Sequence, residues 1–143
     1  MDRVVTKKND YSWKLQKELG ERGVVHVIEW LYLLNNTTGV WDVQDEKEYQ
    51  IKDIDLLWTT ESGGEDYDTA KTIEVKTDFY TTGNFFFETV SNVKKNTLGC
   101  FLKTEADFIF YYFIERGQLY ILNTGAIQKW FLDNKHKYEE KHT

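Results

Sequence analysis

The chain has 143 residues, of which 41% are hydrophobic and 16% aromatic, enough to bury one domain-sized core. Its single cysteine, Cys100, excludes an internal disulfide and a cysteine-based zinc cluster. No apolar run approaches the roughly 18 residues of a membrane span, and the start of the chain lacks an apolar signal-peptide core. We therefore expect a cytoplasmic protein without a membrane partner.

A first helix is predicted from a cap at Asp10 or Ser12 to about Leu34. Its apolar stripe follows helical spacing and comprises Val24, Val27, Ile28, Leu31 and Leu34. Gly20 and Gly23 interrupt the helix, which indicates a bend or a close approach by another backbone. The polar stretch at residues 35–39 is expected to end it.

Beyond this helix, apolar and aromatic runs separated by turn residues predict mostly antiparallel strands. The strands are expected at residues 40–43, 49–59, 70–80, 85–90, 107–114 and 118–122, with a polar hairpin loop at 61–66. Asn123 or Thr124 is expected to cap a last helix over residues 125–137. With no repeat or linker visible, residues 1–143 are interpreted as a single α/β (or α+β) domain. Its central mixed sheet is flanked by helices.

Charged residues stand where core strands are expected, and they are the strongest functional signal. Glu74 and Lys76 are two residues apart, so on a strand they share one face while Val75 points to the other. Asp55 lies within the apolar run that continues as Leu56, Leu57 and Trp58. The simpler interpretation is an ion pair on a solvated strand face, with Asp55 at a strand end or turn.

Two carboxylates and a lysine on neighbouring strands suit phosphodiester hydrolysis, which needs oxygen ligands for Mg²⁺ or Mn²⁺, a positioned water and a cation. Asp55, Glu74 and the backbone carbonyl of Val75 could supply the ligands. Lys76 could orient the water and stabilise the developing charge. Glu21 lies one helical turn before Val24, so its carboxylate is expected on the same face as the core stripe.

Two of these assignments have competitors. Glu18, one helical turn before Glu21, could be the helix carboxylate instead. Asp53 competes with Asp55, because the two would share a face if residues 49–59 form one strand. Asp55 is preferred because the apolar residues that follow it read as a core strand.

Taken in order, Glu21, Asp55 and the run Glu74-Val75-Lys76 resemble the PD-(D/E)XK nuclease superfamily, which has the restriction-endonuclease-like fold. Residues 83–88 and 99–111 also look like segments of several phage and archaeal members, so the resemblance covers roughly residues 20–112. It is nearest to Holliday junction resolvase-like and phage-type members. Each motif is short, whereas their order is moderately specific.

The resemblance implies a Mg²⁺- or Mn²⁺-dependent DNA endonuclease. Its candidate substrates include branched DNA such as a Holliday junction, which would link it to DNA recombination. Asp55, Glu74 and Glu21 would be metal ligands and Lys76 the catalytic lysine, in the cytoplasm of a bacterial or phage-infected cell. A homodimer is expected, because one active site needs a second copy to cut two strands symmetrically. The alternative is a nuclease-fold binding module that has lost catalysis and contacts DNA or a partner protein. The net charge of −6 favours that alternative.

Overall fold

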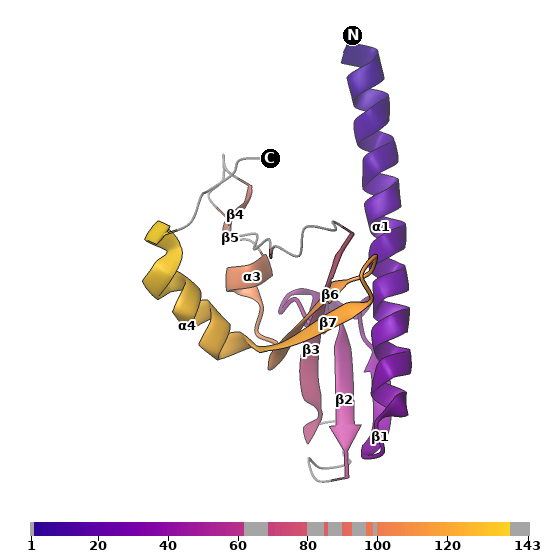
Figure 1. The fold of residues 1–143 in the computed structure, drawn as a ribbon, viewed down its shortest axis with the longest axis vertical. Coiled ribbons are helices and arrows are strands. Elements are labelled where there is room, and N and C mark those ends of the chain that lie inside the picture. The colour runs from indigo at the N-terminus through magenta and orange to yellow at the C-terminus, as the bar shows by residue number, and fades with distance from the viewer. Residues whose placement is uncertain are drawn as a thin grey trace.

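The structure is a computed structural model of the chain, and it describes residues 2–61, 69–79, 85, 90–92, 97–98 and 100–137 (Figure 1). A five-stranded sheet forms its centre, with one long helix running far beyond it. In chain order the elements are α1 (Asp2–Leu33), β1 (Thr37–Asp42), α2 (Lys47–Gln50), β2 (Leu56–Thr60), β3 (Lys71–Asp78), β4 (Val90–Asn92), β5 (Thr97–Leu98), α3 (Cys100–Lys103), β6 (Phe108–Phe113), β7 (Gln118–Asn123), α4 (Thr124–Asn134) and the 3-10 turn Lys135–Lys137.

The sheet has the strand order β1-β2-β3-β6-β7. Strands β1, β2 and β3 pair antiparallel, β6 returns parallel to β3, and β7 is antiparallel to β6. The predicted α/β class with a mixed sheet flanked by helices is therefore confirmed. A separate two-stranded sheet joins β4 and β5.

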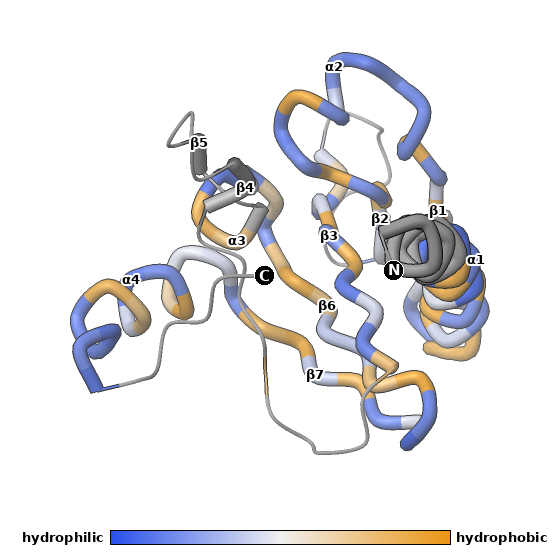
Figure 2. Tube along the Cα trace, turned by 90° about the horizontal axis from the view of Figure 1, so that it is seen from above, coloured by the Kyte–Doolittle hydropathy of each residue, from blue (hydrophilic) through white to orange (hydrophobic). Residues whose placement is uncertain are grey.

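The second half of α1 covers one face of the sheet (Figure 2). The predicted stripe is confirmed: Val24, Val27 and Leu31 are buried, while Ile28 and Leu34 pack partly against the same core. Opposite them lie residues contributed by three strands, namely Leu56, Ile73, Val75 and Phe110. Burying these side chains supplies the main stabilisation of the helix on the sheet.

Gly23 explains how α1 can lie so close to β3. A β-carbon at Gly23 would overlap Oγ1 of Thr77 and lie 2.9 Å from its Cβ, so a side chain of β3 occupies the space. Gly20 has open space around it. The predicted close approach is thus found at Gly23, where it involves a side chain instead of a backbone.

On the opposite face of the sheet, aromatic rings pack around β6. Phe85 lies edge-on to Tyr111, Phe113 and Tyr120, with ring centroids 4.8–5.4 Å apart. The Tyr111 hydroxyl donates a 2.6 Å hydrogen bond to the buried carboxylate of Asp78 on β3. A second apolar cluster on this side joins the start of the sheet to the segment before β6, and its buried members are Val43, Ile54, Leu57 and Ala106.

The predicted strand at residues 49–59 is wrong in its first half. Residues 47–50 form the short helix α2, and the backbone turns again until Ile54. Asp53 adopts a left-handed conformation with φ of 54°, which a strand does not allow. Tyr49 and Ile54 are five residues apart, so a strand would place them on opposite faces, whereas here both pack in the second apolar cluster. The pairing of the later residues is confirmed, because Leu56–Trp58 pairs with Lys71–Ile73.

Other boundaries also differ. Helix α1 begins at Asp2, well before the predicted caps at Asp10 and Ser12, since the intervening residues contain no helix-breaking glycine or proline. Strand β1 begins at Thr37, inside the predicted stop signal. The last helix ends at Asn134, and the predicted cap Asn123 accepts a 2.9 Å hydrogen bond from the Ala126 amide. The predicted loop at residues 61–66 and most of the strand at 85–90 lie outside the described residues.

Candidate metal centre

The candidate site lies where β3 loses one of its two neighbours. Strand β2 begins at Leu56, which pairs with Ile73, and β6 joins β3 on its other side at the same residue, so Ile73 has strands on both sides. From Glu74 to Asp78, β3 pairs with β6 and, in the part of the chain that the structure describes, with no strand on the other side. The sheet is therefore forked at residues 55 and 74.

The Asp55 side chain occupies this fork. Its backbone amide donates a 2.9 Å hydrogen bond to the Ile73 carbonyl, and its Oδ2 accepts a 2.7 Å hydrogen bond from the Val75 amide. The Asp55 carboxylate thus replaces the backbone carbonyl that a longer β2 would offer to the Val75 amide. It satisfies this backbone donor where the two strands separate. Because the N–H and C=O of one strand residue point to the same side, the Val75 carbonyl is directed to the Asp55 side as well.

Burial makes both carboxyl groups at the fork harder to ionise. Burial raises the pKa of Asp55 to about 6, opposed by the Val75 amide and assisted by the negative charges of Asp42 and Asp53. Burial raises the pKa of Glu74 to about 8, and the neighbouring charge of Asp55 adds to this shift. Two partly dehydrated carboxyl groups in electrostatic contact are typical of a site that holds a cation.

Glu74 and Lys76 lie on the face of β3 that is opposite α1, as their spacing predicts. The positive charge of Lys76 lowers the pKa of Glu74, which places the two side chains in electrostatic contact. The Thr104 hydroxyl also lies beside Glu74 and donates a 2.9 Å hydrogen bond to the Asp53 carbonyl. Thr104 is buried, so it fixes Glu74 against the turn that precedes Asp55.

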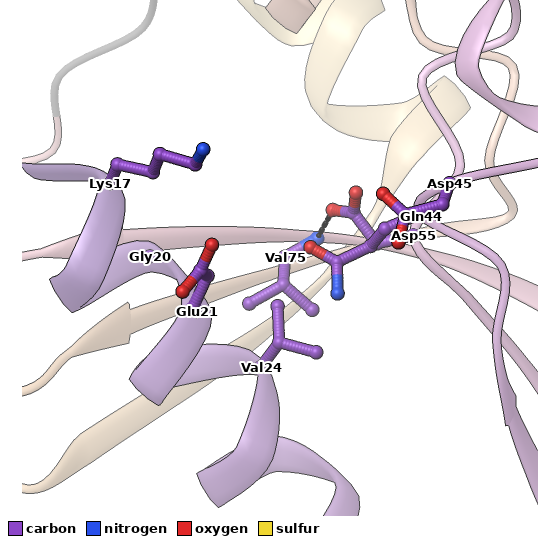
Figure 3. A pocket seen from close by; sticks show the side chains of 8 residues that line it. All are labelled: Lys17, Gly20, Glu21, Val24, Gln44, Asp45, Asp55 and Val75. Atoms are coloured by element: carbon purple, nitrogen blue, oxygen red, sulfur yellow. Dashed lines mark hydrogen bonds between the residues drawn. The ribbon is translucent and has the colours of Figure 1, made fainter.

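A pocket of about 340 Å³ opens beside the fork on the α1 side (Figure 3). Helix α1 contributes one wall, and the end of β1, the start of β2 and β3 contribute the other. The lining residues are Lys17, Gly20, Glu21, Val24, Gln44, Asp45, Asp55 and Val75. Figure 3 shows the Glu21 carboxylate on α1 across the pocket from the hydrogen bond between Asp55 and Val75.

The structure thus brings Asp55, Glu74, Lys76 and the Val75 backbone together, and it places Glu21 across the pocket from Asp55. Glu21 and Glu74 approach the fork from opposite faces of the sheet, because Val75 faces α1 and its neighbour Glu74 faces away. Among the described residues, no three His, Cys, Asp or Glu side chains converge closely enough to hold a metal ion together. Two carboxylates, a backbone carbonyl and water remain as oxygen donors, a set that suits Mg²⁺.

The competing carboxylates occupy different positions. Asp53 lies in a turn before β2. The prediction that Asp53 and Asp55 share one face of a strand is therefore wrong. The Asp53 side chain pairs with Lys103 at 3.8 Å, and burial raises its pKa while Lys103 lowers it. Glu18 is exposed on α1 and does not line the pocket, whereas Glu21 does.

Three residues at the site were missed by sequence reasoning. Gln44 and Asp45 follow β1 directly, and the antiparallel pairing of Asp42 with Leu56 brings them beside Asp55. Their position could have been predicted from the hairpin register of β1 and β2. Thr104 comes from a segment 30 residues beyond Glu74, and no local pattern marks it.

None of the described helices is both long and apolar enough to cross a membrane. Comparisons of the chain with models of protein families, with curated proteins and with solved structures find no match. The function must therefore be inferred from the geometry at the fork and from the chemistry of its side chains.

Proposed function

We propose that this protein is a Mg²⁺- or Mn²⁺-dependent DNA endonuclease of the PD-(D/E)XK type. One observation carries the proposal. Where β3 loses β2, the Asp55 carboxylate binds the Val75 amide at 2.7 Å, and the dehydrated Glu74 carboxyl lies beside it. The order of elements supports the restriction-endonuclease-like fold, with one helix, three antiparallel strands and a parallel return strand.

Asp55, Glu74 and the Val75 carbonyl would hold the cation, with Glu21 completing the site from α1. Bound there, the cation would polarise the scissile phosphate and lower the pKa of water. The hydrogen bond from Val75 keeps one Asp55 oxygen fixed, so the other oxygen remains free to bind. Lys76 would orient the attacking water and stabilise charge on the phosphate, from the same strand face as Glu74.

The substrate approaches over a surface of mixed charge. Lys17 on α1 lines the pocket together with Glu21, so a cation lies within one helical turn of the acidic site. We assign to Lys17 a contact with a backbone phosphate beside the scissile one, because phosphate contacts position nucleic acid without reading sequence. Branched DNA and a homodimer remain part of the proposal, since two strands must be cut.

Comparing Lys76→Ala with a control variant from the same strand tests the mechanism. Lys71 is exposed on the first half of β3, away from the fork, so Lys71→Ala is the matched control. Both variants and the wild type are assayed on branched, duplex and single-stranded DNA with Mg²⁺, Mn²⁺ or EDTA. Lys76→Ala should lose about 100- to 1000-fold in cleavage rate, while Lys71→Ala retains the wild-type rate. EDTA should abolish cleavage by all three proteins.

Equal cleavage by wild type and Lys76→Ala would contradict the mechanism. DNA binding without metal-dependent cleavage by the wild type would instead support the alternative function, a nuclease-fold binding module. The net charge of −6 is the observation that favours that alternative. A salt titration of DNA binding separates the two variants further, because loss of a phosphate contact lowers the salt dependence.

A further inference from the structure

The two outer strands of the sheet differ in how their free edges are protected. At β1 the register shifts between Thr37 and Gly39, and the Tyr32 hydroxyl accepts a 3.1 Å hydrogen bond from the Val40 amide. The same hydroxyl lies 3.5 Å from the Val40 carbonyl, and β1 ends at the charged Asp42. A bulge, a covering side chain and a charge are devices that prevent pairing at a sheet edge.

Strand β7, at the other edge, carries none of these devices within its six residues. Its sequence from Gln118 to Asn123 contains no charge and no proline, and its pairing with β6 is regular throughout. Three of its six residues, Leu119, Ile121 and Leu122, are hydrophobic. Tyr120 is 43% exposed and Ile121 49% exposed, so apolar surface remains at this edge.

The backbone of β7 also presents free groups along this edge. The Thr124 amide donates to the Asp107 carbonyl, so residues of even number direct their backbone groups toward β6. By alternation, the N–H and C=O groups of Leu119, Ile121 and Asn123 point away from the sheet. Among the described residues no strand pairs with β7 on that side.

We propose that β7 pairs antiparallel with β7 of a second copy of this chain. A two-fold axis between the copies brings the residues of one β7 near the same residues of the other β7. Two charged strands would repel each other in this arrangement, whereas β7 has no charged residue. Direct partners in such a pair lie on the same face, which sets Ile121 against Ile121 or Leu119 of the other copy. The result is a continuous ten-stranded sheet.

This arrangement predicts where the two candidate sites lie. The axis is perpendicular to the sheet, so both α1 helices cover the same face. Five strand spacings of about 4.8 Å separate the two β3 strands, which places them about 24 Å apart. The inference rests on β7 alone and does not require nuclease activity.

The test is sedimentation of the full-length protein without DNA or metal, over a wide concentration range. Wild type should form dimers, whereas Ile121→Lys should raise the dimer dissociation constant at least about 100-fold, through like charges across the axis. Ile121→Glu should do the same, and an equimolar mixture of the two variants should dimerise again. Val25→Lys is the matched control, because Val25 is also about half exposed, at 50%, but lies on α1. This variant should remain dimeric.

A monomeric wild type, an undiminished Ile121→Lys dimer, or a folded lysine–glutamate mixture that stays monomeric would each overturn the proposal. Hydrogen exchange of the wild type provides a readout that needs no variant. The amides of Leu119 and Ile121 should exchange more slowly as protein concentration rises. The amides of Arg116 and Gly117, which donate to carbonyls within their own turn, should not change. Concentration-independent exchange at both strand amides would also overturn it.

Discussion

The two halves of β3 lie under the same helix but differ in their neighbours. Lys71–Ile73 has β2 on one side, and β6 joins on the other at Ile73, whereas Glu74–Asp78 pairs with β6 on one side. Ile73 is fully buried, while Glu74 to Thr77 are each partly exposed. The difference places the charged residues Glu74 and Lys76 where β2 no longer pairs with β3.

The fork in the sheet reduces stability, because it leaves a backbone amide of β3 without a neighbouring strand. The Val75 amide would lack an acceptor without the Asp55 carboxylate, so the fork requires a side-chain acceptor. Placing that acceptor beside Glu74 buries two carboxyl groups together, which raises both pKa values. Strain of this kind is expected at functional sites, where stability is lost in exchange for chemistry.

The largest effect should appear at Ile73, the residue of β3 that pairs with a strand on both sides. Ile73→Ala removes a buried side chain from the core beneath α1 and should destabilise the protein by about 3 kcal/mol. Val75→Ala is the control from the other half, and its partly exposed side chain should cost about 1 kcal/mol. Urea unfolding of both variants measures the difference. Equal losses would mean that the two halves do not differ in packing.

A smaller effect of opposite sign is expected at the fork. Glu74→Gln should stabilise the metal-free protein by about 2 kcal/mol at pH 9 and leave it unchanged at pH 4. The value is about half of what the full pKa shift would give, because the Glu74 side chain keeps partial contact with water, which screens its charge. The folded state raises the pKa of Glu74 from 4.5 to about 8, so it favours the protonated form. That contribution is fully present below pH 4.5 and is lost as the pH rises through 8, whereas glutamine cannot ionise.

Unfolding in EDTA across this pH range measures the effect of Glu74→Gln. Glu115→Gln serves as its control, because Glu115 is exposed in the turn between β6 and β7. A wild type whose stability rises between pH 5 and pH 9 relative to Glu74→Gln would show that the carboxyl is not destabilised by burial.

The smallest effect concerns metal binding. Millimolar Mg²⁺ or Mn²⁺ at pH 8 should stabilise the wild type by about 1 kcal/mol, because a ligand that binds the folded state shifts the unfolding equilibrium. The stabilisation should weaken at pH 5, where both carboxyl groups bind protons in competition with the metal. Asp55→Asn should abolish it. Thermal unfolding with and without EDTA measures these differences, and an equal response by Asp55→Asn would exclude Asp55 as a ligand.

Local patterns in the sequence predicted the parts of the fold that depend on one element. The helical stripe from Val24 to Leu34 was correct because its spacing alone defines a buried face. The alternation at Glu74, Val75 and Lys76 was correct for the same reason, with Val75 packed beneath α1. Residues 108–113 and 118–123 were predicted within one residue at each end, since both are apolar runs bounded by turns.

Features that depend on two distant elements could not be predicted in this way. Trp41 and Trp130 are 37% and 44% exposed although both are large and apolar, because hydrophobicity does not tell which face a strand or helix buries. The turn that holds Asp53 depends on contacts with Lys103 and Thr104, about 50 residues away. The fork itself arises from where β2 begins relative to β3, which no single segment encodes.

Gly23 couples the choice of residue on α1 to the choice of residue on β3. Thr77 fills the space that a side chain at position 23 would need, so a larger residue at either position must be compensated by a smaller one at the other. Gly23 is two residues from Glu21, and Thr77 is two residues from Val75, so both contacts lie next to the pocket. The absence of a side chain at position 23 therefore allows α1 to lie close to β3 beside the pocket.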